Sequence, residues 1–185
     1  MLELILLSLG LSCVTGVLAL VFGKAHAASK TIACVGGMIS AALSFAGGVG
    51  ALFAAPVYAS WAGPLPFTNF TLLLNPLAGL LIAVIAALAC MAWLYGLSYF
   101  DEYYDKGIGV IGFFMNLFIA SMNLVILSDN AFWFLVFFEL MSLTSYVLVI
   151  IDQTEKSLRG GFLYLIMAHI GFLMIACSFF VMATA

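Results

Sequence analysis

The most constraining feature of this sequence is a run of 70 residues, from Thr31 to Phe100, that contains no charged side chain. Soluble folds present charge to water on every element, and about a quarter of the residues in soluble domains are charged. Here only 7% of the residues are charged and 66% are apolar. The chain is therefore predicted to be an integral membrane protein, and a water-soluble globule is excluded.

Polar and helix-breaking residues divide the 185 residues into six apolar segments, each long enough for a span of about 20 residues. The expected helices cover about 2–22, 31–55, 76–99, 108–127, 131–151 and 158–183. Pro56 ends the second helix, Pro76 opens the third, and Asp129 is placed to cap the fifth. The sequence therefore predicts an all-α fold, a polytopic transmembrane helical bundle, as a single domain over residues 1–185.

The only long connection runs from Pro56 to Asn75, and its prolines and glycine indicate a loop. Trp61, Phe67 and Phe70 are expected at the level of the lipid headgroups, where aromatic side chains are enriched. His26 is placed in the polar connection between the first and second helices.

The basic residues predict the orientation of the chain in the membrane, because cytoplasmic connections carry an excess of Lys and Arg. All five fall in or next to the first, third and fifth connections: Lys24, Lys30, Lys106, Lys156 and Arg159. These connections are expected in the cytoplasm. Both termini are then on the outer side of a multi-pass protein of the cell inner (plasma) membrane.

The sequence carries no pattern typical of catalysis, cofactor binding or metal binding. Its four cysteines lie singly in apolar runs, where cysteine behaves as a small hydrophobic residue, and none forms a CxxC pair. No nucleophile–base pair and no nucleotide-binding glycine loop is present. Five basic residues cannot form a phosphate-binding stripe, so nucleic acid is not expected as a partner. We predict no catalytic residue, no cofactor and no metal in this chain.

Glu139 is the main charge at membrane depth, with apolar residues on both sides. A charge at the centre of a span costs at least ~2.5 kcal/mol, so this acid needs a partner, a watery cavity or a proton. Ser142 and Tyr146 follow on the same helical face, and Ser145 lies on its flank. This polar stripe is expected to face the bundle interior. The plainer interpretation of Glu139 is a packing anchor bonded to a serine or a carbonyl.

His169 is the second ionisable group at depth. Counting ~1.5 Å per residue from the expected helix ends places it at nearly the level of Glu139 on the next, antiparallel helix. An acid removed from water beside an imidazole, which titrates near neutrality, forms a plausible proton relay. A histidine at a helix contact is also often purely structural.

Four stretches of the second half point to a family. They are Tyr99–Tyr104, Gly112–Met122, Asp129–Phe134 and Phe138–Tyr146. Together they resemble the antiporter-like membrane subunits of respiratory complex I, energy-converting hydrogenases and Mrp-type sodium/proton antiporters. The likeness is strongest to the hydrogenase 4 branch, which is related to formate hydrogenlyase. It extends from about Leu97 to Leu173 and, more weakly, through the first three helices.

The resemblance implies proton (or sodium) translocation coupled to electron transfer, with the lipid bilayer and other membrane and redox subunits of a hydrogenase or NADH-quinone oxidoreductase-type complex as partners. Glu139 matches the family's helix-5 glutamate, which pairs with a lysine on helix 7. His169 falls in a stretch that looks like the hydrogenase branch. Family members have many more helices, so the chain is expected to correspond to their N-terminal six. The alternative is a truncated remnant, or a scaffold that packs against other subunits without moving ions.

Overall fold

The computed structural model describes residues 1–63, 68–100 and 107–184. Its six helices are α1 (Leu2–Val21), α2 (His26–Leu52), α3 (Pro76–Tyr99), α4 (Ile108–Leu127), α5 (Ala131–Val149) and α6 (Glu155–Thr184). All six are long and apolar enough to cross a membrane. The predicted helical transmembrane fold is therefore confirmed.

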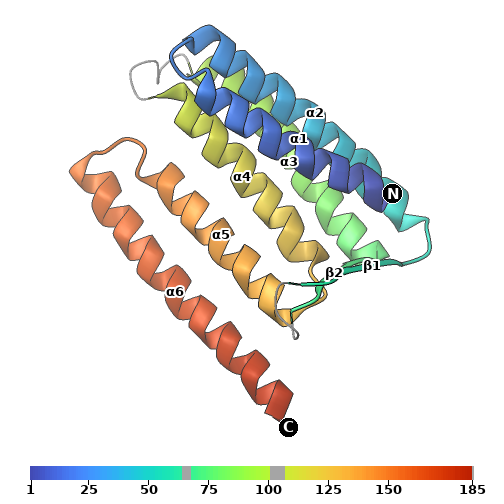
Figure 1. Ribbon diagram of the computed structural model, residues 1–185. Helices are drawn as coiled ribbons and strands as arrows, with labels where there is room; N and C mark the ends of the chain where they lie inside the picture. Colours follow the sequence, from blue (N-terminus) through green and yellow to red (C-terminus); the bar gives the residue numbers. More distant parts are fainter. Residues whose placement is uncertain (64–67, 101–106, 185) are drawn as a thin grey trace.

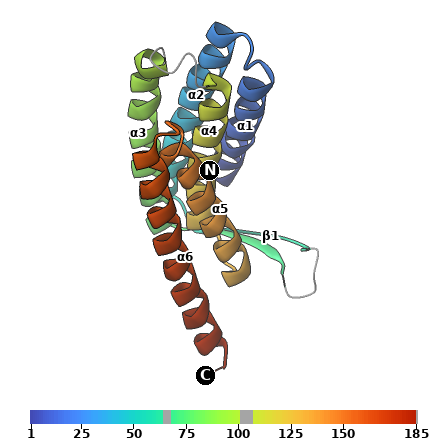
Figure 2. The same cartoon turned by 90° about the vertical axis from the view of Figure 1, so that its left-hand side faces the viewer.

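Helices α1 to α4 form a closely packed group, and α5 and α6 lie along one side of it (Figure 1). α2 packs between α1 and α3, and α4 packs against α1 and α5. α6 packs mainly against α5, and Gly161 is its only buried residue within the described part of the chain. Figures 1 and 2 both show α6 extending beyond the end of α5. Most of the α6 surface is therefore left uncovered.

The two ends of the bundle differ in charge. The N-terminus, the C-terminus and the connection between α2 and α3 lie at one end, and the α1–α2 and α5–α6 connections lie at the other (Figure 1). The second end carries Lys24, Lys30, Lys156 and Arg159, whereas Lys106 lies outside the described residues. The described basic residues thus share one end, and the side of the membrane that this end faces stays a prediction.

Helices α1 and α2 are joined by hydroxyl pairs and by close packing over glycine. The side chains of Ser8 and Ser44 form one buried hydrogen bond, and those of Ser12 and Ser40 form another. A Cβ on Gly36 would lie 2.3 Å from Thr15 Cγ2, and one on Gly47 would lie 2.7 Å from Ile5 Cγ1. Lipid is as apolar as the helix surfaces, so the hydrophobic effect does not hold two membrane helices together. Close packing and hydrogen bonds between the helices stabilise their contact instead.

Helix α2 begins at His26, five residues before its predicted start. His26 therefore lies in the first turn of a helix, and its predicted place in a polar connection is wrong. Ser29 Oγ donates to Ala19 O at 2.7 Å and ties this turn to the end of α1. The prediction failed because polar residues mark where a span leaves the hydrocarbon, which need not be where the helix ends.

The long connection contains a hairpin where the sequence predicted only a loop. Strands β1 (Val57–Trp61) and β2 (Phe70–Leu74) pair antiparallel, with Val57 opposite Leu74 and Trp61 opposite Phe70. The hairpin projects sideways from the end of the bundle (Figure 2). The usable signal was two short apolar runs, Val57–Trp61 and Phe70–Leu74, flanked by proline, glycine and asparagine.

Aromatic side chains fasten the hairpin to the start of α5. The Trp133 indole N–H donates to Thr68 O at 3.0 Å. The centroid of the Phe70 ring lies 5.2 Å from that of the Trp133 ring and 5.7 Å from that of the Trp61 ring. The headgroup level predicted for Trp61 and Phe70 stays a prediction, and Phe67 lies outside the described residues.

The cap of α5 is Asn130, because its Oδ1 accepts a hydrogen bond from Phe132 N at 2.9 Å. Asp129 was predicted to cap this helix; instead its backbone N–H donates to Thr71 O. Asn130→Ala is expected to lower the free energy of unfolding by about 1 kcal/mol, measured by equilibrium unfolding in micelles. Asp129→Ala keeps the backbone bond and is the matched control, so an equal loss in both variants would contradict this assignment.

Candidate functional site

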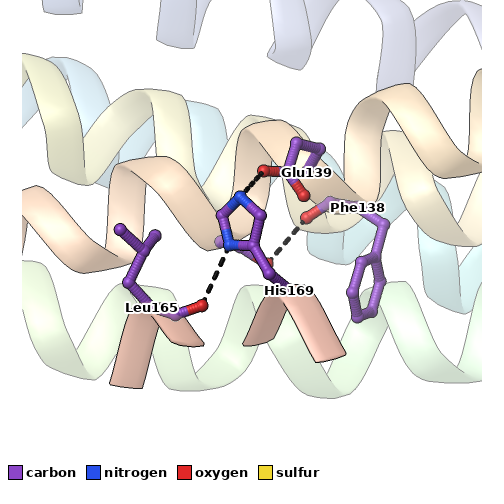
Figure 3. A network of polar contacts seen from close by, with 5 residues as sticks. Phe138, Glu139, Leu165 and His169 are labelled. Atoms are coloured by element: carbon purple, nitrogen blue, oxygen red, sulfur yellow. Dashed lines mark hydrogen bonds and ion pairs between the residues drawn. The ribbon is translucent and has the colours of Figure 1, made fainter. Parts of the chain in front are cut away.

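Glu139 and His169 are in direct contact across the α5–α6 interface (Figure 3). Glu139 Oε1 lies 2.9 Å from His169 Nε2. Each residue stands near the midpoint of its helix, because α5 runs from Ala131 to Val149 and α6 from Glu155 to Thr184. The two ionisable residues that the sequence places at one depth thus meet far from both ends of their spans.

Contacts on both sides of this pair hold α5 and α6 together. Toward one end, Gly161 of α6 leaves room for α5, because a Cβ there would lie 2.3 Å from Ile150 Cγ2 and 3.3 Å from Tyr146 Cε2. Toward the other end, the Phe134 and Phe179 rings meet edge to face, with centroids 5.7 Å apart. The acid and the imidazole therefore lie between a close approach of the helices and an aromatic contact.

The second nitrogen of the imidazole is also engaged. His169 Nδ1 lies 2.9 Å from the backbone oxygen of Leu165, one turn earlier in α6 (Figure 3). The ring is held by its own helix on one side and faces Glu139 on the other. Sequence reasoning missed Leu165 because the partner is a backbone atom, which every residue type carries.

Ser142, in the predicted polar stripe, makes its hydrogen bond away from the Glu139 side chain. Ser142 is buried, and its hydroxyl donates to Phe138 O at 3.0 Å, so it bonds its own helix rather than Glu139. Tyr146 contacts α6 at Gly161, and Ser145 is partly buried. The stripe was expected to face the bundle interior, and for Glu139 this is only partly right. Its side chain is 26% exposed, and that of His169 is 46% exposed.

Glu139 lines an open apolar groove of about 510 Å³. The other lining residues are apolar: Phe132, Leu135, Val136, Leu140, Leu143 and Phe172. The second carboxylate oxygen, Oε2, is buried and has no hydrogen-bond partner among the described residues. Within the same parts of the chain, no three His, Cys, Asp or Glu side chains gather as metal ligands would. The chemistry that the atoms of the pair can supply themselves is proton exchange.

Comparison with known sequences identifies relatives of this chain. No protein-family model matches the chain. Over 124 residues, 67% of this chain, it is 44% identical to Hydrogenase-4 component B of Escherichia coli (strain K12). The chain is a relative of hydrogenase-4 component B. It is also 33% identical over 87 residues to NAD(P)H-quinone oxidoreductase subunit 5, chloroplastic, of Marchantia polymorpha. The predicted resemblance to the hydrogenase 4 branch is thereby confirmed.

The chain spans only a part of these relatives, namely 18% of hydrogenase-4 component B and 12% of the Marchantia protein. A solved structure agrees with the fold. A chain of the membrane-bound sulfane sulfur reductase, an archaeal respiratory membrane complex, matches 91% of this chain and 34% of its own length, with a TM-score of 0.77 at 18% sequence identity. At that identity the match establishes the arrangement of helices and nothing about the chemistry.

Proposed function

We propose that this chain is a membrane subunit that takes part in proton (or sodium) translocation, coupled to electron transfer by other subunits of a hydrogenase 4 or NADH-quinone oxidoreductase-type complex. The observation that carries the proposal is the 2.9 Å contact between Glu139 and His169 at the middle of two spans. Intramembrane ionisable residues are costly, and they typically mark ion pathways. The relatives named for hydrogenase and quinone oxidoreductase support the same assignment.

The pair has the chemistry for one step of a proton path. A carboxyl group and an imidazole each bind and release a proton, and at 2.9 Å a proton passes between them without an intervening water. The described part of the chain holds no other ionisable pair at this depth, so the remaining steps of the path would involve residues outside this part of the chain. In the inner (plasma) membrane, the end with the basic residues would face the cytoplasm and both termini would lie outside.

Glu139→Gln tests the proposal because the amide keeps the shape of the side chain and cannot release a proton. The complex that the chain forms in its own membranes is purified and reconstituted into lipid vesicles, and an imposed potassium diffusion potential drives ions inward. Internal pH and sodium dyes measure the flux. Glu139→Gln is expected to reduce the flux of the transported ion to that of protein-free vesicles.

Glu3→Gln is the matched control, because Glu3 is exposed in the first turn of α1. It is expected to conduct as the unchanged chain does. Equal flux from the Glu139→Gln and the unchanged vesicles, at equal protein content, would refute a role of Glu139 in translocation.

A second candidate is a scaffold that moves no ions. It is favoured by the uncovered surface of α6, in which an apolar stretch of 18 residues contains no buried residue. A helix so exposed suits packing against other membrane subunits. In that case Glu139→Gln would leave the flux unchanged and lower the amount of other subunits recovered with the chain.

A further inference from the structure

The hairpin is bonded to α5 at the point where the helix begins. Just before the helix, Asp129 N donates to Thr71 O of β2 at 3.1 Å. In the first turn of the helix, the Trp133 indole N–H donates to Thr68 O at 3.0 Å. The hairpin therefore holds both the chain that enters α5 and a side chain of the helix itself.

Ring contacts continue this attachment to within two residues of Glu139. The Phe70 ring of β2 meets the Phe137 ring edge to face, with centroids 6.0 Å apart, and the Trp133 and Phe137 rings stack with centroids 5.8 Å apart. Residues two apart in a helix point to nearly opposite sides. The hairpin thus contacts one side of α5, while Glu139 meets His169 of α6 on the other.

The first half of α5 has no buried side chain to fix its rotation about the helix axis. The buried residues of α5 are Ser142 and Thr144, which both follow Glu139. Residues 131–141 are exposed or partly exposed. The Glu139 carboxyl group stands away from the helix axis, so a small rotation of this half would move it out of hydrogen-bond distance. Its place therefore depends on the contacts of α5 with the hairpin.

The oxygen that Trp133 bonds is itself kept accessible by a glycine. A Cβ on Gly63 would collide with the backbone oxygen of Thr68. This oxygen is part of the backbone and cannot rotate away as the end of a side chain can. A substitution at Gly63 would therefore displace the acceptor, just as a substitution at Trp133 removes the donor.

We infer that Trp133 is a positioning residue: through its hydrogen bond to Thr68 O, the hairpin sets the rotation of α5 and thereby the place of the Glu139 carboxyl group. Gly63 acts through the same bond. The consequence for ion translocation rests on the proposed function. The place of the carboxyl group can be measured without any ion flux.

Trp133→Phe tests the inference because it keeps an aromatic ring beside Phe70 and Phe137 and removes the indole N–H. Solid-state NMR of the complex in lipid bilayers measures the dipolar coupling between the carboxyl carbon of Glu139 and Nε2 of His169, assigned by its loss in Glu139→Gln. Loss of one hydrogen bond shifts an equilibrium by about fivefold. Trp133→Phe is therefore expected to weaken the coupling and to lower the vesicle flux by about fivefold.

Trp61→Phe is the matched control, because it makes the same change in β1 of the hairpin. Trp61 is 46% exposed, and its indole donates no hydrogen bond to the described residues. The coupling and the flux are expected to stay as in the unchanged chain. Equal coupling in Trp61→Phe, Trp133→Phe and the unchanged chain would overturn the inference.

Gly63→Ala gives a second test from the acceptor side. It is expected to weaken the coupling as Trp133→Phe does, and the double variant should lose no more than either single variant, because both act on one bond. A double variant that loses the sum of the two effects would contradict a shared bond. A weakened coupling in Trp133→Phe together with undiminished flux in Glu139→Gln would reject translocation and keep the positioning role.

Discussion

Gly48→Ala is expected to force α2 and α3 apart and to lower the free energy of unfolding by about 2–3 kcal/mol. A Cβ on Gly48 would lie 2.7 Å from Gly79 O and 2.8 Å from Ala83 N. Both are backbone atoms, which cannot rotate away as a side chain can. The backbones of the two helices would have to separate at this point. Equilibrium unfolding in mixed micelles, followed by circular dichroism, measures the loss.

The same substitution at Gly10 is the matched control, because a Cβ there meets nothing within 4 Å. Both variants gain the higher helix propensity of alanine, about 1 kcal/mol, so their difference isolates the clash. If Gly48→Ala and Gly10→Ala were equally stable, the close packing of α2 on α3 would be wrong.

Gly161→Leu is expected to lift α6 from α5 and to break the contact between Glu139 and His169. Gly161 packs closely on the end of α5, since even a Cβ would lie 2.3 Å from Ile150 Cγ2. A leucine needs more room than movement of one isoleucine provides. We expect the ion flux into vesicles to fall to the protein-free level. In nitrogen-15 NMR spectra, the chemical shift of His169 Nε2 should change to that of a nitrogen without a hydrogen bond.

Gly160→Leu places the same side chain one residue earlier, where a Cβ meets nothing within 4 Å. It should insert into the membrane as well as the Gly161 variant does and should leave both the flux and the His169 spectrum unchanged. Equal behaviour of the two variants would show that the α5–α6 approach at Gly161 does not hold the site together.

The spans were predictable because a helix that crosses the hydrocarbon needs about 20 apolar residues, and such runs can be read from the sequence. A run of this length must be helical, because unpaired backbone groups are not tolerated in lipid. The ends were harder to predict. α6 starts at Glu155 rather than near residue 158, because Thr154 Oγ1 accepts a hydrogen bond from Ser157 N. In the sequence, a lone threonine before a charged turn is as typical of a connection as of a helix start. The hairpin was missed for a related reason, since proline and glycine mark the end of a strand as readily as a loop.

At the site, the sequence predicted the two ionisable residues and their shared depth, because helical rise converts residue number into distance. It could not predict how their hydrogen bonds are divided. Ser142 lies on the face of Glu139 and yet bonds Phe138 O, since a helical serine always has a nearby carbonyl to bond. The role of the Leu165 carbonyl depends on the rotamer of His169, which helical spacing does not determine.

The contact between α1 and α2 has a consequence for how the bundle finds its register. A long uncharged segment could slide along its neighbour with little change in apolar contact. Here Ser8 meets Ser44 and Ser12 meets Ser40, while Ile5 fits over Gly47. A shift of one helical turn would leave one serine pair in place of two and would move Ile5 away from Gly47. The alignment of α1 and α2 is thus set by serine hydroxyls and by glycine. These groups carry no net charge, so neither salt nor the voltage across the membrane should change it.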